Sequence, residues 1–248
     1  MKVGVFDSGI GGLTVVKSLL EHQLFEEIIY FGDTARVPYG SKDKNTIIRY
    51  GIEAVEFFKN FELDMIIVAC NTVSAYALNE MRENASCPVI GVVEAGVLAS
   101  NNALSDKSEN VLVIGTHATI NSKAYEKGLQ SLNFTNLQAK ATPLFVPLVE
   151  EEIFSGAILD ETFKHYFQNI EHPKAVILGC THFPLLSQSL SNYFGAQTQL
   201  IHSGDAIVQY LEKEFSFSKK FPNPKIDFFA SENPEALRTI AKKWLYEK

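Results

Sequence analysis

An internal repeat restricts the fold of this chain more than any other feature of its sequence. Three pairs of segments match: Met65-Ile-Ile-Val-Ala-Cys70 with Ala175-Val-Ile-Leu-Gly-Cys180, Val37-Pro38 with Val146-Pro147, and, loosely, Val3-Gly-Val-Phe6 with Val111-Leu-Val-Ile114. The spacing is 110, 109 and 108 residues respectively, and the order is the same. Buried strands resemble one another by chance, but three matches in register favour two similar halves.

Short β-branched runs alternate with amphipathic stretches along the chain, which is typical of an α/β protein with mainly parallel sheets. Strands are predicted at 2–6, 27–31, 65–69, 89–92, 110–114, 137–141, 175–178, 200–202 and 226–229. Helices are predicted at 12–21, 44–60, 72–84, 95–104, 122–132, 160–169, 183–193, 204–214 and 234–246.

Composition excludes several classes of protein. The 248 residues are 46% hydrophobic and carry a net charge of −7, without the basic face that nucleic-acid binding requires. No apolar run reaches the roughly 18 residues of a membrane-spanning helix, and the N-terminal run is too short for a signal peptide. Three widely spaced cysteines do not form a disulfide framework, so we expect free thiols in a reducing cytoplasm.

Two cysteines occupy equivalent places in the repeat. Cys70 and Cys180 each follow a predicted strand and precede a predicted helix. Ligands of parallel sheets bind beyond the carboxyl ends of the strands, so the two thiols are expected to face one cleft from opposite sides. Unpaired N–H groups at the helix starts would lower the thiol pKa from about 8.5 and bind a carboxylate. The alternative is that both are buried small hydrophobes, as predicted for Cys87.

The segment Asp7-Ser8-Gly9-Ile10-Gly11-Gly12 directly follows the first predicted strand. Thr14 interrupts the G-x-G-x-x-G pattern, and Asp7 would repel a pyrophosphate, so a dinucleotide site is not predicted. The glycines suit close approach of the backbone to a small ligand. Asp7 could receive an ammonium group or act as a base toward a thiol, with a helix N-cap as the alternative.

Other polar residues accompany the two cysteines. His182 could share a proton with Cys180, hold a ligand, or only cap a helix. Glu150 could pair with His182, although its neighbours at 151 and 152 are equally acidic. The polar loop 32–43 contains Tyr39 and Gly40 and is long enough to suggest function. Neither C-x₂-C nor H-x₃-H spacing occurs, so no metal site is predicted.

Taken together, these motifs resemble those of the bacterial glutamate racemase family, within the wider aspartate/glutamate racemase superfamily. The resemblance covers residues 2–210, and no motif position departs from the family pattern. The motifs are Gly4-Val-Phe-Asp-Ser-Gly-Ile-Gly-Gly12, Gly32-Asp-Thr-Ala-Arg-Val-Pro-Tyr-Gly40, Val68-Ala-Cys-Asn-Thr72 and Leu178-Gly-Cys-Thr-His-Phe-Pro184.

The resemblance implies roles for individual residues. Cys70 and Cys180 would be the catalytic acid/base pair, assisted by Asp7, His182 and Glu150. The substrate contacts that it implies are Asp7, Ser8, Tyr39, Gly40, Asn71, Thr72, Thr181 and His182. It also implies a cytoplasmic homodimer that needs no cofactor and supplies D-glutamate for peptidoglycan. Two opposed thiols can exchange base and acid roles, and no lysine at a strand end near the cleft suggests a Schiff base.

The family fold implies two three-layer α/β domains, related by a pseudo-twofold axis, with the active site in the cleft between them. We expect a discontinuous first domain of residues 1–95 and 205–248, and a second domain of residues 96–204.

Three alternatives remain open at the level of sequence. A related racemase could act on aspartate or a hydantoin, or the enzyme could be a maleate isomerase. A solute-binding protein with two α/β lobes would have inert cysteines. A thiol redox enzyme is disfavoured because no C-x-x-C occurs.

Overall fold

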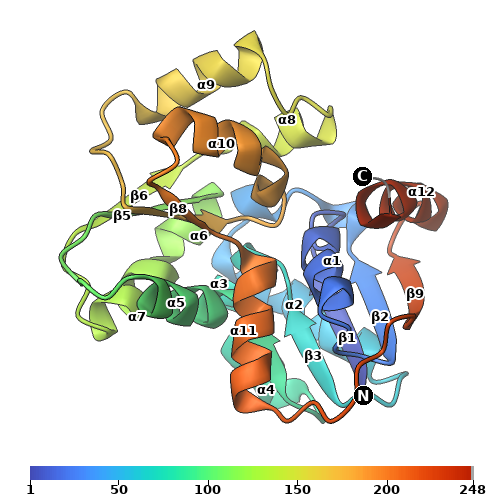
Figure 1. Ribbon diagram of the computed structural model, residues 1–248. Coiled ribbons are helices and arrows are strands. Elements are labelled where there is room, and N and C mark those ends of the chain that lie inside the picture. Colours follow the sequence, from blue (N-terminus) through green and yellow to red (C-terminus); the bar gives the residue numbers. More distant parts are fainter. Residues whose placement is uncertain (247–248) are drawn as a thin grey trace.

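The computed structural model describes residues 1–246 and contains two parallel β-sheets, each flanked by helices (Figure 1). Sheet A has the order β4-β3-β1-β2-β9, with β1 Lys2–Asp7, β2 Glu27–Gly32, β3 Met65–Val68, β4 Val89–Gly91 and β9 Lys225–Ala230. Sheet B has the order β6-β5-β7-β8, with β5 Val111–Gly115, β6 Leu137–Ala141, β7 Ala175–Gly179 and β8 Gln199–Ile201. The predicted fold of two parallel α/β units is confirmed.

The strand orders of the two sheets correspond. β4-β3-β1-β2 in sheet A matches β8-β7-β5-β6 in sheet B, so the strands before Cys70 and Cys180 occupy the same place. β9 pairs with the outer edge of β2 and has no counterpart in sheet B within residues 1–246. Val37-Pro38 and Val146-Pro147 begin five residues after the ends of the corresponding strands β2 and β6, although the first pair lies in an irregular loop and the second in a helix.

Most predicted helices form, with changes at their ends. The α-helices are α1 Leu13–Glu21, α2 Lys44–Phe58, α3 Asn71–Tyr76, α4 Leu78–Asn84, α5 Val92–Ala103, α6 His117–Ser122, α7 Ala124–Ser131, α8 Phe145–Glu150, α9 Ala157–Phe167, α10 Ser187–Phe194, α11 Ser203–Glu214 and α12 Pro234–Tyr246. Short 3₁₀ helices span Thr34–Arg36, Tyr39–Ser41 and Phe183–Leu186.

Two of the predicted helices differ from the structure by more than their end residues. The helix predicted at 72–84 is divided at Ala77 into α3 and α4. The helix predicted at 122–132 is preceded by α6, and Lys123, with a φ of 56°, separates α6 from α7. The short helix α8 was not predicted, because its six residues span less than two turns of apolar periodicity.

Apolar side chains form layers on both faces of each sheet. Phe6 and Val68 of sheet A pack against α2, α3 and α4. Leu112 and Leu178 of sheet B pack against α8, α9 and α10. The opposite faces of the two sheets contribute to one common core together with α1, α5, α7 and α11. Strands covered on both sides explain the almost unbroken apolar runs in the sequence.

Helices α5 and α11 pack against each other within this common core, as Figure 1 shows near the centre of the molecule. The predicted domain boundaries at 95/96 and 204/205 fall inside these two helices, so the exact boundaries stay a prediction. Across residues 1–246, no helix combines the length and apolarity needed to cross a bilayer.

Candidate active site

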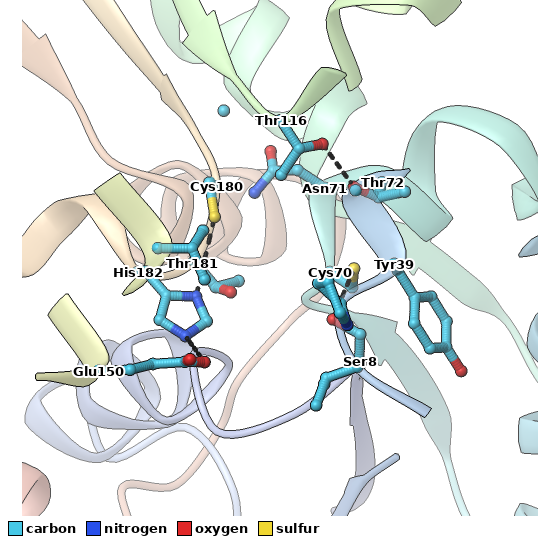
Figure 2. A pocket seen from close by; sticks show the side chains of 15 residues that line it. Ser8, Tyr39, Cys70, Asn71, Thr72, Thr116, Glu150, Cys180, Thr181 and His182 are labelled. Atoms are coloured by element: carbon cyan, nitrogen blue, oxygen red, sulfur yellow. Dashed lines mark hydrogen bonds and ion pairs between the residues drawn. The ribbon is translucent and has the colours of Figure 1, made fainter. Parts of the chain in front are cut away.

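A small pocket of about 40 Å³ lies where strands of both sheets end. Ser8 follows β1 and Cys70 follows β3 of sheet A, while Thr116 follows β5 and Cys180 follows β7 of sheet B. Figure 2 shows Cys70 with Ser8 on one side of this pocket, and Cys180 with His182 on the opposite side. The sequence repeat therefore brings two equivalent thiols to one cavity.

The glycine loop after β1 contacts both halves of the molecule. A Cβ atom on Gly11 would lie 2.3 Å from Thr181 Oγ1 and 2.6 Å from His182 Nδ1, so only glycine allows this approach. The Thr14 hydroxyl donates a hydrogen bond to the Thr181 carbonyl at 2.8 Å. These contacts explain the glycines of the loop by close packing against the segment after β7, and no phosphate site is needed to account for them.

Asp7 is fully buried beside this loop. Its carboxylate accepts hydrogen bonds from the Gly9 N–H at 2.9 Å and from the Thr181 hydroxyl at 3.3 Å. Burial raises the pKa of Asp7 above its ordinary value, although His182 and these donors oppose the shift. Helix α1 has Gly12 at its N-cap, so Asp7 does not serve as the helix cap considered from the sequence.

Cys70 is buried with its Sγ 3.4 Å from the Ser8 Oγ. Burial, followed by the nearby charge of Asp7, raises the pKa of Cys70 to about 12. The expectation that the helix start lowers this pKa is wrong for Cys70, because desolvation and the Asp7 charge outweigh the hydrogen bonds with Ser8 and Val73. Cys70 therefore holds its proton at neutral pH.

Cys180 belongs to a chain of contacts that extends to the surface. Its Sγ lies 3.8 Å from His182 Nδ1, and His182 Nε2 lies 3.3 Å from Glu150 Oε1 (Figure 2). Burial lowers the pKa of His182, but Cys180, Glu150 and Asp7 outweigh it and raise that pKa to about 10. His182 is therefore an imidazolium at neutral pH, beside Cys180.

The structure distinguishes among the three consecutive glutamates. Glu150 lines the pocket and faces His182. Glu152 instead forms an ion pair with Lys243 of α12, and Glu151 is exposed. Trp244, on the same helix as Lys243, places its ring edge-to-face with His182 at a centroid distance of 6.4 Å.

Threonine hydroxyls from the two halves meet at another wall of the pocket. Thr72 Oγ1 lies 3.0 Å from Thr116 Oγ1 and 3.1 Å from Thr119 Oγ1. Sequence reasoning identified Thr72 but missed Thr116. The repeat contained the signal, since Thr116 stands 108 residues after Ser8, the spacing of the strands that precede them.

The loop with Tyr39 and Gly40 also reaches the pocket. Figure 2 shows the Tyr39 hydroxyl directed away from the cavity, and this hydroxyl bonds to the buried carboxylate of Asp33, which also binds Arg36 at 2.6 Å. Tyr39 therefore lines the pocket without presenting its hydroxyl to it. Asp33 was not selected from the sequence, because nothing there shows that its partner is a tyrosine six residues away.

The predicted site residues thus gather around one cavity. Asn71, Thr181 and Gly40 line it with the residues described above, while Asp7 lies behind Thr181 and Ser8. Cys87 lies outside it and packs against the core beneath α2. In the described part of the chain, no group of three His, Cys, Asp or Glu side chains is arranged to hold a metal ion.

Comparisons with known proteins agree with this arrangement. The Asp/Glu/Hydantoin racemase family matches residues 14–211. A glutamate racemase from Nitratiruptor sp. is 61% identical over 99% of this chain and 96% of that protein. The crystal structure of glutamate racemase from Campylobacter jejuni superimposes with a TM-score of 0.97 at 57% identity, covering 99% of this chain and 98% of that one.

A more distant structure preserves the same fold. The glutamate racemase from Francisella tularensis, crystallised in complex with D-glutamate, has a TM-score of 0.84 at 37% identity and covers 98% of this chain and 93% of that one. Identity at this level over nearly full length, with two thiols at equivalent strand ends, places the chain in the glutamate racemase family of Asp/Glu/hydantoin racemases.

Proposed function

We propose that this protein interconverts L- and D-glutamate by proton transfer at the α-carbon, with one thiol on each face of that carbon. The observation that carries the proposal is the placement of Cys70 and Cys180 on opposite sides of one small pocket (Figure 2). Inverting a stereocentre requires a base on one face and an acid on the other. Two identical groups serve both directions of the reaction.

The surroundings of each thiol suit different starting roles. Cys70 holds its proton because its pKa is raised to about 12, so it is ready to act as an acid. The His182 imidazolium lies beside Cys180 and would stabilise a thiolate there once it forms. We assign the Cys180 proton to the His182 imidazole, which gives a thiolate–imidazolium pair. In the direction from L-glutamate, that thiolate takes the α-proton and Cys70 donates its own proton to the opposite face.

The reverse direction requires Cys70 to lose its proton. Asp7 is the carboxylate whose charge acts on Cys70, and its own pKa is raised by burial. A buried carboxylate with a raised pKa can accept the proton of Cys70, so one buried negative charge moves from Asp7 to Cys70 and no second one is created. We therefore assign Asp7 to assist Cys70, and His182 with Glu150 to assist Cys180.

The remaining residues at the pocket would bind glutamate and stabilise the carbanion. The proposed contacts are Asp7, Ser8, Tyr39, Gly40, Asn71, Thr72, Thr181 and His182. Backbone N–H groups at the start of α3 can bind a carboxylate. Burial of the site excludes water, which strengthens every charge interaction with the intermediate. The product D-glutamate would serve cytoplasmic peptidoglycan synthesis.

The first prediction is that the purified protein racemises glutamate without a cofactor. Protein dialysed against a chelator and hydroxylamine should racemise L-glutamate and D-glutamate as fast as undialysed protein. The loss of the circular dichroism of each enantiomer measures the rate. Aspartate and hydantoins, tested in parallel, should react at least roughly a hundredfold more slowly. Activity that returns only with pyridoxal phosphate or a metal would contradict the mechanism, and faster turnover of aspartate would contradict the substrate.

The second prediction concerns the two thiols. Cys70→Ser and Cys180→Ser should each lower glutamate racemisation roughly a thousandfold, because a hydroxyl is a far weaker acid than a thiol. Cys87→Ser, which changes a thiol outside the pocket, should stay within about twofold of the wild type.

Half-reactions can show which face each thiol serves. With 3-chloroglutamate, which loses chloride after one deprotonation, Cys70→Ser should retain elimination from the L-enantiomer only. Cys180→Ser should retain elimination from the D-enantiomer only. Two single variants that both racemise glutamate at the wild-type rate would rule out the two-thiol mechanism, and one fully active variant would favour a single base.

The third prediction tests the contact between Glu150 and His182. Glu150→Gln removes a charge that raises the pKa of His182, so the imidazolium should lose its proton at lower pH than in the wild type. Elimination from L-3-chloroglutamate should fall roughly tenfold near pH 9, and its alkaline limb should move to lower pH. Elimination from the D-enantiomer should change less than about twofold.

Glu151→Gln is the matched control, since it removes the same charge from an exposed neighbour. Its pH profile should coincide with that of the wild type. An alkaline limb that stays in place in Glu150→Gln, or moves equally in Glu151→Gln, would show that Glu150 does not act through His182.

The fourth prediction is the homodimer implied by family resemblance. Sedimentation at micromolar concentration should give twice the mass of one chain, and added DNA should not change the boundary, because the net charge is −7. A stable monomer, or a salt-sensitive complex with DNA, would overturn the respective part of this proposal.

A further inference from the structure

We infer that Tyr125 and Ser203 are positioning residues that hold the side-chain amide of Asn71 with an N–H available to the substrate. The inference rests on the proposed function, because it assigns to Asn71 a donor role toward the carboxylate of glutamate. Neither Tyr125 nor Ser203 lines the pocket itself. Both act only through Asn71, which does.

The directions of three hydrogen bonds determine how the amide is turned. The Leu178 carbonyl can only accept, so the Ser203 hydroxyl donates to it at 3.4 Å. Ser203 Oγ is then an acceptor for Asn71 Nδ2 at 3.2 Å. Asn71 Oδ1 accepts in turn from the Tyr125 hydroxyl at 2.6 Å. A flipped amide would set Oδ1 against the Ser203 oxygen, whose only hydrogen is donated to Leu178, although the Tyr125 oxygen could still accept from the amide nitrogen.

These residues come from different parts of the fold. Asn71 begins α3 after β3 of sheet A, whereas Tyr125 belongs to α7, which follows sheet B. Ser203 begins α11, which packs in the common core. The amide of Asn71, which follows Cys70, is therefore held by Tyr125 and Ser203, which lie outside sheet A. Ser203 in turn bonds to Leu178 of β7, the strand that leads to Cys180.

Tight packing keeps the Tyr125 hydroxyl in place. A Cβ on Gly96 of α5 would lie 3.0 Å from the Tyr125 ring, and one on Gly179 would lie 3.4 Å from it. Asn71, Tyr125 and Ser203 are only 2%, 2% and 3% exposed. A buried amide that loses a partner cannot replace it with bulk water, so the orientation of Asn71 is strongly held.

The held orientation leaves one donor unused. Within residues 1–246, Asn71 Nδ2 makes no hydrogen bond besides the one to Ser203, although it carries two hydrogens. Figure 2 shows the Asn71 amide between Cys180 and Thr116, at the edge of the cavity. An amide nitrogen attracts a carboxylate, whereas the amide oxygen of a flipped Asn71 would repel it.

Deletion of either anchor tests the inference. Tyr125→Phe and Ser203→Ala should each raise the KM for glutamate about tenfold, the effect of one poorly oriented hydrogen bond to a charged group. The kcat should stay within about threefold, because this contact exists before and during proton transfer. Ser100→Ala deletes an equally buried hydroxyl that bonds only within α5, and should leave both constants unchanged.

A double-variant cycle separates positioning from general loosening of the fold. In an Asn71→Ala background, Tyr125→Phe should raise KM by less than about twofold further, since no amide remains to be oriented. An equal KM increase with and without Asn71, or a normal KM in both anchor variants, would overturn the inference. The thermal midpoint of each variant shows whether it is folded. If Tyr125→Phe is unfolded, the KM of Ser203→Ala tests the inference.

The wild-type protein, measured alongside, keeps this inference distinct from the proposed function. Loss of the proposed function would appear as a wild type inactive on glutamate. An active wild type with unchanged anchor variants would reject only the role of Tyr125 and Ser203.

Discussion

The candidate site depends on the direct contact between the glycine loop after β1 and the segment after β7. Gly11 packs against Thr181 and His182 without room for a side chain, and Thr14 donates to the Thr181 carbonyl. Asp7 accepts from the Thr181 hydroxyl in the same interface. Without this close approach, Cys70 and Cys180 would not face a common cavity. With it, the two strand ends form opposite walls of a single small cavity.

Burial then gives the two walls different chemical character. On one side, desolvation and the Asp7 charge keep the proton on Cys70. On the other, Glu150 and Asp7 help to keep His182 charged although burial opposes it. The repeated backbone places the two thiols symmetrically, whereas their different neighbours give the two sides of the pocket different proton affinities. The proposed reversible proton transfer would benefit from both, because in that mechanism the two thiols start in opposite states.

Regular features of the sequence predicted the parallel sheets, the repeat and the cluster around Cys70 and Cys180, since strand burial and periodicity are local properties. Other features depend on partners distant in the chain. Glu150 faces His182 whereas Glu152 pairs with Lys243, and neither partner is close in the chain. The raised pKa of Cys70 results from its burial, and the position of Cys70 before a helix does not predict how deeply it is buried. Tyr125 stands 54 residues from the amide that it binds.

The pairing of β2 with β9 has a consequence for biosynthesis. The two strands are joined through residues such as Glu27 and Lys225, which are 198 positions apart. During translation the outer edge of β2 therefore stays without its partner strand while all of sheet B is being made. An unpaired, apolar strand edge invites association with other chains. The nascent protein thus passes through a long interval in which chaperone protection of that edge is most valuable.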